Sequence, residues 1–350
     1  MSTVTSASPT NAAAQNQPHR RGCLFYVKRG LLALVGLLAV LLILGFSYET
    51  IMAAGDAQRY PAPGQLVMVD GYSMHIRCLG EGSPTVILES GAGGFSMMWP
   101  ETIVTQLSQT TRVCAYDRAG YGWSDPRLEP RTAWQIASEL HHLLENAQIE
   151  APYILVGASN GGLYVRSYTA DYPQEVAGLV LVDGTSEAEL DKTKGLPGGI
   201  FAVMGRLGIF RLFPDMICPG SACDETAKPM IAAFRGRASL YQTVDNEWAA
   251  LQASDALAIL RERLSPPASL SDTPLVILRA NQSGVPESDM DTRYRSYIAS
   301  DRETMTALSS NHRYILVSSG HAIANEHPGL LIESVNAVID AAQTGDALAK

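Results

Sequence analysis

Residues 153–161 read Tyr-Ile-Leu-Val-Gly-Ala-Ser-Asn-Gly, an apolar run that leads directly into the pattern G-x-S-x-G. This order predicts a buried strand that turns sharply into a helix, with Ser159 at the turn. Such a turn strains the serine backbone and exposes its hydroxyl, while Gly157 and Gly161 let the helix and the strand approach each other. Ser159 is therefore a candidate nucleophile. The alternative is a serine that begins a helix and has no chemistry.

Apolar runs and amphipathic stretches alternate on both sides of this turn. The runs at 85–88, 112–116 and 176–182 are typical of buried strands, and 133–147 has the apolar spacing of a helix. This alternation predicts an α/β fold, with a mostly parallel sheet of eight strands flanked by helices. The other expected strands lie at 66–69, 73–78, 153–156, 275–278 and 314–317, and the other expected helices at 97–107, 288–308 and 330–342.

The alternation stops between 187 and 272, where no strand pattern is present. Helical stretches at 204–213, 228–237 and 246–263 are separated there by glycines and prolines. We expect this segment to be a helical cap inserted into the sheet domain. The α/β core then consists of two parts of the chain, 65–186 and 273–345.

The N-terminal region differs in composition from the rest of the chain. Residues 1–29 form a polar tail that becomes basic, which predicts disorder. Residues 30–54 contain an unbroken apolar run at 31–46, and together with 47–54 this stretch is long enough to cross a bilayer as a signal anchor; 55–64 form a linker. The excess of positive charge before the span predicts a cytoplasmic N-terminus and a catalytic domain on the extracytoplasmic side. The alternative is a signal peptide that is cleaved near 53–55, giving a secreted protein.

Composition limits the possible partners. The chain has 350 residues, 46% of them hydrophobic, and a net charge of -9. This length suits one large α/β domain with an insertion, and the acidic balance argues against nucleic acid as a partner. Because the chain lacks C-x-x-C pairs and His-rich tracts, we expect no metal site.

Four of the five cysteines form two candidate pairs. Cys218 and Cys223 are close in sequence, and Cys78 and Cys114 fall on strands that are expected to be neighbours. An exported protein permits disulfides at both places, and free buried thiols are the alternative.

A histidine follows the last expected strand. His321 comes after Ser318-Ser319-Gly320, at the sheet edge where the serine is also expected. It is the candidate general base, since a base must reach the serine hydroxyl.

The acid that orients this histidine has more than one candidate. Asp183 ends the strand at 176–182 and gives the chain order serine, aspartate, histidine. No acidic residue directly follows the strand at 275–278, but Glu287, Asp289 and Asp291 come later in the chain. We favour Asp183, and these three acids stay as alternatives.

The oxyanion of an acyl-transfer reaction needs two backbone N–H donors. We expect one from Asn160, which follows the serine, and one from Ala92 in the glycine-rich loop at 90–94. This loop does not match the spacing of phosphate-binding loops.

From about 66 to 342 the chain resembles the α/β-hydrolase superfamily. The serine turn, the loop at 90–94, the Asp-Arg-Ala-Gly-Tyr-Gly-Trp-Ser turn at 117–124 and Gly320-His321 fall in the family order. The resemblance implies a cap between strands six and seven and a hydrolase that needs no cofactor. Ser90 and Ala158 stand where many members have histidine. Asp183 matches members whose acid follows strand six.

We therefore expect a serine hydrolase that cleaves a small-molecule ester or related acyl substrate. A serine at the turn argues against the epoxide-hydrolase and haloalkane-dehalogenase branches, which use aspartate there. One alternative is an aminopeptidase or amidase, for which Asp224, Glu225, Asp245 or Glu247 would recognise a free amine. Another is a non-catalytic binding protein that uses the same fold.

Overall fold

The computed structural model describes residues 23–127, 129–190, 198–218, 225–264, 270–281 and 292–349. The chain divides into two compact units, with the boundary between Leu44 and Gly45. The first unit contains most of helix α1 (Cys23–Ala54), which begins seven residues before the expected span at 30–54. By length and composition this helix could cross a membrane, with a mean hydropathy of 2.6 in its most apolar window.

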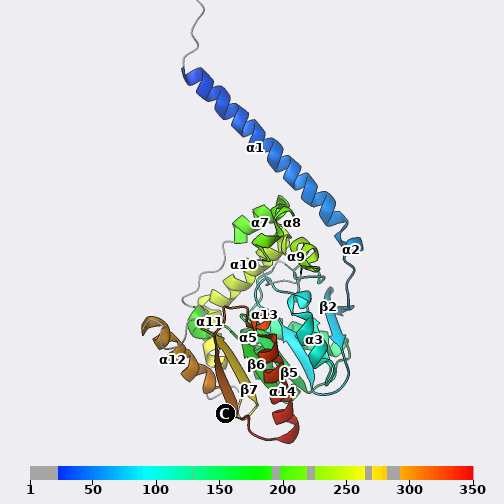
Figure 1. The fold of residues 1–350 in the computed structure, drawn as a ribbon, viewed down its shortest axis with the longest axis vertical. Coiled ribbons are helices and arrows are strands. Elements are labelled where there is room, and N and C mark those ends of the chain that lie inside the picture. Colours follow the sequence, from blue (N-terminus) through cyan, green and yellow to red (C-terminus); the bar gives the residue numbers. More distant parts are fainter. Residues whose placement is uncertain are drawn as a thin grey trace, which may run out of the picture. The chain divides into compact units, whose positions relative to one another are not determined.

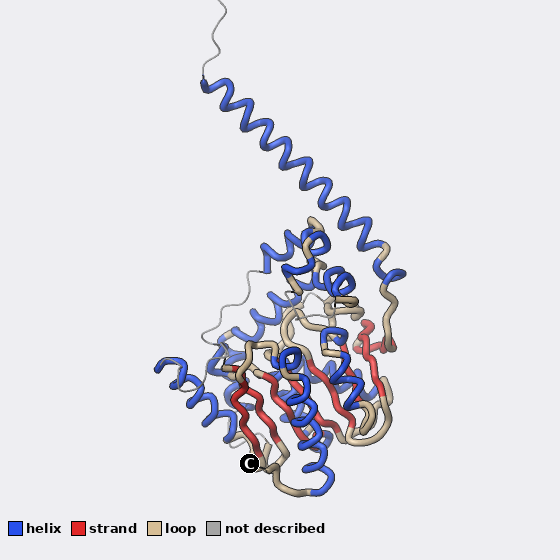
Figure 2. The backbone as a smooth tube through the Cα atoms, in the orientation of Figure 1, coloured by secondary structure: helices blue, strands red, loops and turns tan. Residues whose placement is uncertain are grey.

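The second unit is built on one twisted sheet (Figures 1 and 2). Its eight strands in the described residues have the order β1-β2-β4-β3-β5-β6-β7-β8. β1 and β2 are antiparallel to their neighbours, and β3 to β8 are parallel. The strands are β1 (Gln65–Val69), β2 (Tyr72–Leu79), β3 (Thr85–Glu89), β4 (Val113–Tyr116), β5 (Tyr153–Ala158), β6 (Val176–Val182), β7 (Leu275–Ala280) and β8 (His312–Val317).

Helices cover both faces of this sheet, as the alternation of the sequence predicts. One buried cluster joins the sheet to α4, α5 and α12, and the other joins it to α3 and α14. The expected α/β fold is confirmed. The core helices are α3 (Glu101–Leu107), α4 (Ala133–Asn146), α5 (Gly161–Asp171), α12 (Thr292–Thr306), α13 (Ile323–Glu326) and α14 (Pro328–Thr344).

Between β6 and β7 the described residues are helical. Figure 1 shows α7 and α8 in this segment on the far side of α10 from the sheet. These helices are α6 (Glu187–Leu190), α7 (Gly198–Arg206), α8 (Ile209–Leu212), α9 (Lys228–Arg235), α10 (Ala238–Gln252) and α11 (Ser254–Leu264), and the short α2 (Asp56–Arg59) precedes the sheet.

Three expected helices are divided by local breaks. The stretch at 204–213 is split between α7 and α8 at Gly208, whose φ of +69° interrupts the helical path. The stretch at 246–263 is split between α10 and α11 at Ala253, where ψ is 133°. In the stretch at 97–107, Pro100 lies between a 3-10 turn (Ser96–Met98) and α3. The predicted continuous helices were wrong at these points because apolar spacing does not reveal a single non-helical residue.

A disulfide joins two adjacent strands near the start of the sheet. Cys78 on β2 and Cys114 on β4 are direct partners in the register, and their sulfurs are bonded. Cys218 is also disulfide-bonded, and its candidate partner Cys223 lies outside the described residues.

Replacing both Cys78 and Cys114 with alanine should lower the free energy of unfolding by roughly 2–4 kcal/mol, because the unfolded chain loses a loop constraint. The measurement is urea denaturation of the full-length protein in detergent. The matched control is Cys23→Ala, at a residue that begins α1. Equal midpoints for the double variant and this control would contradict the expectation.

Candidate functional site

Ser159 lies at a sharp turn between β5 and α5. Its φ is +52°, a left-handed conformation that a serine adopts only at a cost. Its N–H donates to the Val182 carbonyl at 3.1 Å, which fixes the turn to the end of β6. A Cβ at Gly157 would lie 2.7 Å from the Gly161 carbonyl oxygen, so the strand and the helix meet at a distance that only glycine allows.

The glycine-rich loop after β3 presses against this turn. A Cβ at Gly91 would lie 2.8 Å from Ser159 Cβ and 3.4 Å from Ser159 Oγ. In the part of the chain that the structure describes, the N–H groups of Ala92 and Asn160 donate to no protein acceptor. Among the described residues, neither N–H group is therefore used by a protein acceptor, which an oxyanion donor also requires.

His321 and Asp183 are in direct contact. Asp183 Oδ2 lies 2.5 Å from His321 Nδ1, although the two residues are 138 positions apart in the chain. The Asp183 side chain is 6% exposed and that of His321 is 64% exposed. A buried carboxylate thus holds one ring nitrogen, and the imidazole itself remains accessible to solvent or a substrate.

The end of β7 holds Asp183 in place. The Ala280 N–H donates to Asp183 Oδ1 at 3.0 Å, and the Arg279 guanidinium lies 3.3 Å from the same oxygen. Arg279 is fixed in turn by Asp301, with an Nη2–Oδ1 distance of 2.7 Å, and by the Gly184 carbonyl at 2.9 Å. Sequence reasoning missed Arg279 as a site residue. The sequence signal for Arg279 was its position directly after the strand expected at 275–278, where we looked for an acidic residue.

These contacts shift the pKa values of both partners. Burial alone would raise the pKa of Asp183, but the hydrogen bond from His321 and the charge of Arg279 hold it below its ordinary value. The hydrogen bond to Asp183 raises the pKa of His321 above its ordinary value. Asp183 is therefore ionised at neutral pH. The alternative acids Glu287, Asp289 and Asp291 lie outside the described residues.

A second buried network lies behind the glycine-rich loop. Arg118 donates to Glu89, to the Ser90 carbonyl at 2.5 Å and to the Gly91 carbonyl at 3.0 Å. Glu247 of α10 approaches the same guanidinium, with an Nε–Oε1 distance of 3.4 Å. Burial raises the pKa of the Glu89 carboxyl to about 7, and the charge of Arg118 opposes that shift. One arginine thus links the loop beside Ser159 to a helix between β6 and β7.

Glu247 is fully engaged by other core residues as well. It accepts from Arg131 at 2.6 Å and from the Tyr121 hydroxyl at 2.5 Å. Its buried carboxylate already has these partners, so the structure does not favour Glu247 as the acid that would bind a substrate amine. Glu225 forms an ion pair with Lys228 at 2.7 Å, and Asp224 lies outside the described residues.

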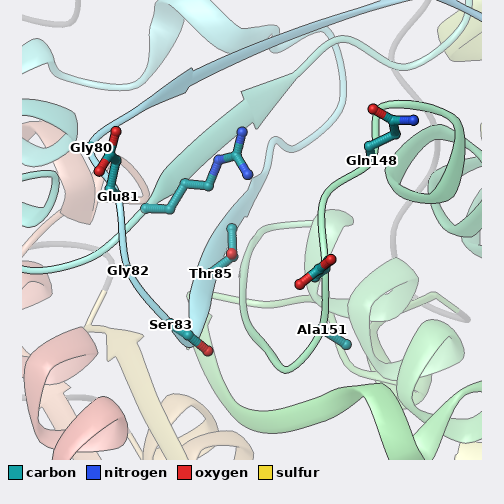
Figure 3. Close-up of a pocket in the computed structure, with 9 residues that line it drawn as sticks. Gly80, Glu81, Gly82, Ser83, Thr85, Gln148 and Ala151 are labelled. Atoms are coloured by element: carbon teal, nitrogen blue, oxygen red, sulfur yellow. The ribbon is translucent and has the colours of Figure 1, made fainter.

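A cavity of about 520 Å³ opens at the other edge of the sheet (Figure 3). Its lining includes Gly80, Thr85 and Ala151. Thr85 begins β3, whereas the loop beside Ser159 follows the end of β3. The cavity is therefore separate from the candidate active site. In the described ranges no cluster of histidine, cysteine and acidic side chains is arranged to hold a metal ion.

The fold resembles that of solved hydrolases, and part of the sequence matches a family model of the same fold. A family model of the α/β hydrolase fold matches residues 84–214. Among solved structures, the epoxide hydrolase CorEH has a TM-score of 0.60 at 17% identity, covering 80% of this chain and 98% of its own. The enol-lactonase from Burkholderia xenovorans has a TM-score of 0.58 at 19% identity. The match covers 79% of this chain and 100% of the enol-lactonase chain. The chain has the α/β-hydrolase fold, and the predicted resemblance to that superfamily is confirmed at the level of the fold.

Curated relatives match shorter stretches. An AB hydrolase superfamily protein of Gibberella zeae is 38% identical over 109 residues, which are 30% of this chain and 33% of the relative. A probable transporter of Hormonema carpetanum is 37% identical over 110 residues, 30% of this chain and 16% of the relative. An uncharacterized vacuolar membrane protein of Saccharomyces cerevisiae is 32% identical over 139 residues, which are 35% of this chain and 21% of the relative. The chain spans a third or less of the length of these relatives.

Gly91→Ala should slow the reaction of Ser159 with a fluorophosphonate by about 100-fold, because the new methyl group would displace the serine or the loop. The measurement is the rate of covalent labelling of the full-length protein. Gly329→Ala is the matched control, since a Cβ there meets nothing within 4 Å. Equal labelling rates for the two variants would show that the loop does not constrain the serine.

Proposed function

We propose that this protein is a serine hydrolase that cleaves an ester or a related acyl substrate. The observation that carries the proposal is the 2.5 Å contact between His321 Nδ1 and Asp183 Oδ2 at the sheet edge where Ser159 occupies its strained turn. The fold and its hydrolase neighbours support the broader class. A serine at the turn favours acyl transfer through an acyl-enzyme.

In the proposed mechanism, His321 takes the proton of the Ser159 hydroxyl as the oxygen attacks the substrate carbonyl. The Ala92 and Asn160 N–H groups stabilise the oxyanion of the tetrahedral intermediate. Asp183 holds the imidazole tautomer and stabilises the imidazolium. The leaving alcohol receives the proton, and water activated by His321 then releases the acid from Ser159.

We also propose that α1 anchors this hydrolase in a membrane. Its apolar length and the membrane protein among its relatives support association with a bilayer. Lys28 and Arg29 precede the apolar run, and Glu49 and Asp56 follow it. This asymmetry favours an N-terminus in the cytoplasm and a catalytic domain on the other side.

Ser159→Ala should abolish labelling of the full-length protein by a fluorophosphonate, since only an activated serine reacts with this probe. Ser318→Ala, beside the histidine loop, serves as a control that retains labelling. The proposal fails if the Ser159→Ala variant still reacts, or if the folded parent protein does not react at all.

Asp183→Asn should lower kcat for a p-nitrophenyl ester by about 10⁴-fold, because the amide favours the wrong imidazole tautomer. It should also move the acidic limb of kcat/KM to lower pH. His321 must be neutral to act as a base, and its raised pKa in the parent makes activity fall at a higher pH than an ordinary histidine would. Without the carboxylate, the neutral form persists to lower pH.

The pH–rate profile of kcat/KM tests this expectation. Asp340→Asn is the control, since Asp340 is an exposed residue of α14. If kcat and the acidic limb of kcat/KM are unchanged in the Asp183→Asn variant, Asp183 is not the acid of the mechanism. The acids at 287, 289 and 291 then become the candidates.

A further inference from the structure

Exposed apolar side chains are concentrated on one short segment between β6 and β7. Beyond α1, eight large hydrophobic residues of the described chain are exposed, and five of them lie between 200 and 216. We call these five the cap face. They are Ile200 and Val203 of α7, Leu212 of α8, Phe213, and Met216 of the next turn, each 53–64% exposed. Such a concentration marks an interaction surface, because single exposed apolar residues are normally scattered.

The same segment has a second apolar side, which is buried. Phe210 of α8 packs with Ile217 and with Tyr241 of α10 in a buried cluster. The inward side of this segment is therefore already filled, and the cap face is a separate set of side chains that points outward. Ile200 and Val203 are three residues apart, the spacing that puts side chains on one side of a helix.

The last turns of α1 contact this segment. A Cβ at Gly45 would lie 2.9 Å from the Leu207 carbonyl oxygen, and one at Gly208 would lie 2.7 Å from Tyr48 Cδ1. Leu207 and Gly208 form the link between α7 and α8. The end of the apolar helix therefore packs directly on the link that carries the cap face on either side.

An ion-pair cluster fixes this contact. Arg211 of α8 binds Glu49 of α1, with an Nε–Oε2 distance of 2.7 Å, and Asp56 of α2 at 2.5 Å. All three side chains are at most 12% exposed. Removing one partner would leave a buried charge unpaired, which is costly, so the cluster keeps the segment against α1.

These contacts determine the level of the cap face relative to the surface of a bilayer. The apolar run of α1 ends at Phe46, and Tyr48 and Glu49 follow. Tyrosine is enriched at membrane–water interfaces, and a carboxylate marks the end of the hydrocarbon region. Because Tyr48 contacts the link between α7 and α8, that link lies at the level of the interface whenever α1 spans the membrane.

We propose that the cap face lies in the lipid–water interface of the membrane that α1 crosses. The proposal rests on the membrane anchor proposed above. Its apolar side chains would enter the boundary between headgroups and acyl chains, and the exposed Arg206 beside them suits the phosphate groups. The hydrolase would then sit with this cap segment on the bilayer, so that an apolar acyl substrate could reach it from the lipid phase.

The test places a tryptophan on the cap face of the full-length protein in phosphatidylcholine vesicles. Phe213→Trp is compared with Met68→Trp, an equally exposed position on β1. Fluorescence is measured in vesicles with and without phosphatidylcholine brominated at acyl carbons 6 and 7, and the parent signal is subtracted. We expect the added fluorescence of Phe213→Trp to fall at least twofold with brominated lipid, and that of Met68→Trp to remain unchanged.

Two results would overturn the proposal and can be told apart. If the protein floats with vesicles after a carbonate wash but the Phe213→Trp signal is not quenched, the anchor stands and the cap face meets water or another protein instead. If the protein does not float, the anchor fails and the cap face fails with it. Neither readout depends on hydrolase activity, so a failure of the proposed reaction would leave both outcomes interpretable.

Discussion

The left-handed turn at Ser159 is the constraint on which the rest of the site depends. A serine keeps a φ of +52° only when its surroundings leave no alternative, and here three segments supply that restraint. The Ser159 N–H is bonded to β6, Gly157 meets Gly161 at close range, and Gly91 lies against the serine side chain. Each glycine occupies a place where a methyl group would collide, so the close packing of these segments and the left-handed turn at Ser159 depend on the same glycines.

The same left-handed backbone conformation occurs at Asp183, the proposed acid. Its φ is +45°, and it lies at the end of the strand beside β5. Its N–H donates to the Leu278 carbonyl at 2.7 Å, and its carboxylate accepts from Ala280. β7 therefore supplies donors and an acceptor to Asp183. In the proposed mechanism, with Asp183 as the acid, no acid is needed directly after β7.

The sequence predicted the parts of this structure that depend on local pattern. The eight strands were predicted from apolar runs, and the shared sheet edge of Ser159, Asp183 and His321 follows from their positions after parallel strands. Contacts between distant residues could not be predicted. Arg118 and Glu247 are 129 positions apart, and no periodicity indicates that they meet. Glu247 was a candidate to recognise a free amine, and nothing in the local sequence indicates that Arg118 and Arg131 contact it.

The contact between Arg118 and Glu247 joins α10, a helix between β6 and β7, to the core of the sheet domain. Arg118 holds the carbonyls of Ser90 and Gly91, and its charge is balanced by Glu89 from the core and Glu247 from α10. Moving α10 away would leave a buried guanidinium without one of its two carboxylates, a cost of several kcal/mol. The position of α10 and the geometry of the glycine-rich loop are therefore coupled. A cap held at a membrane would, through this arginine, also hold the loop beside the serine.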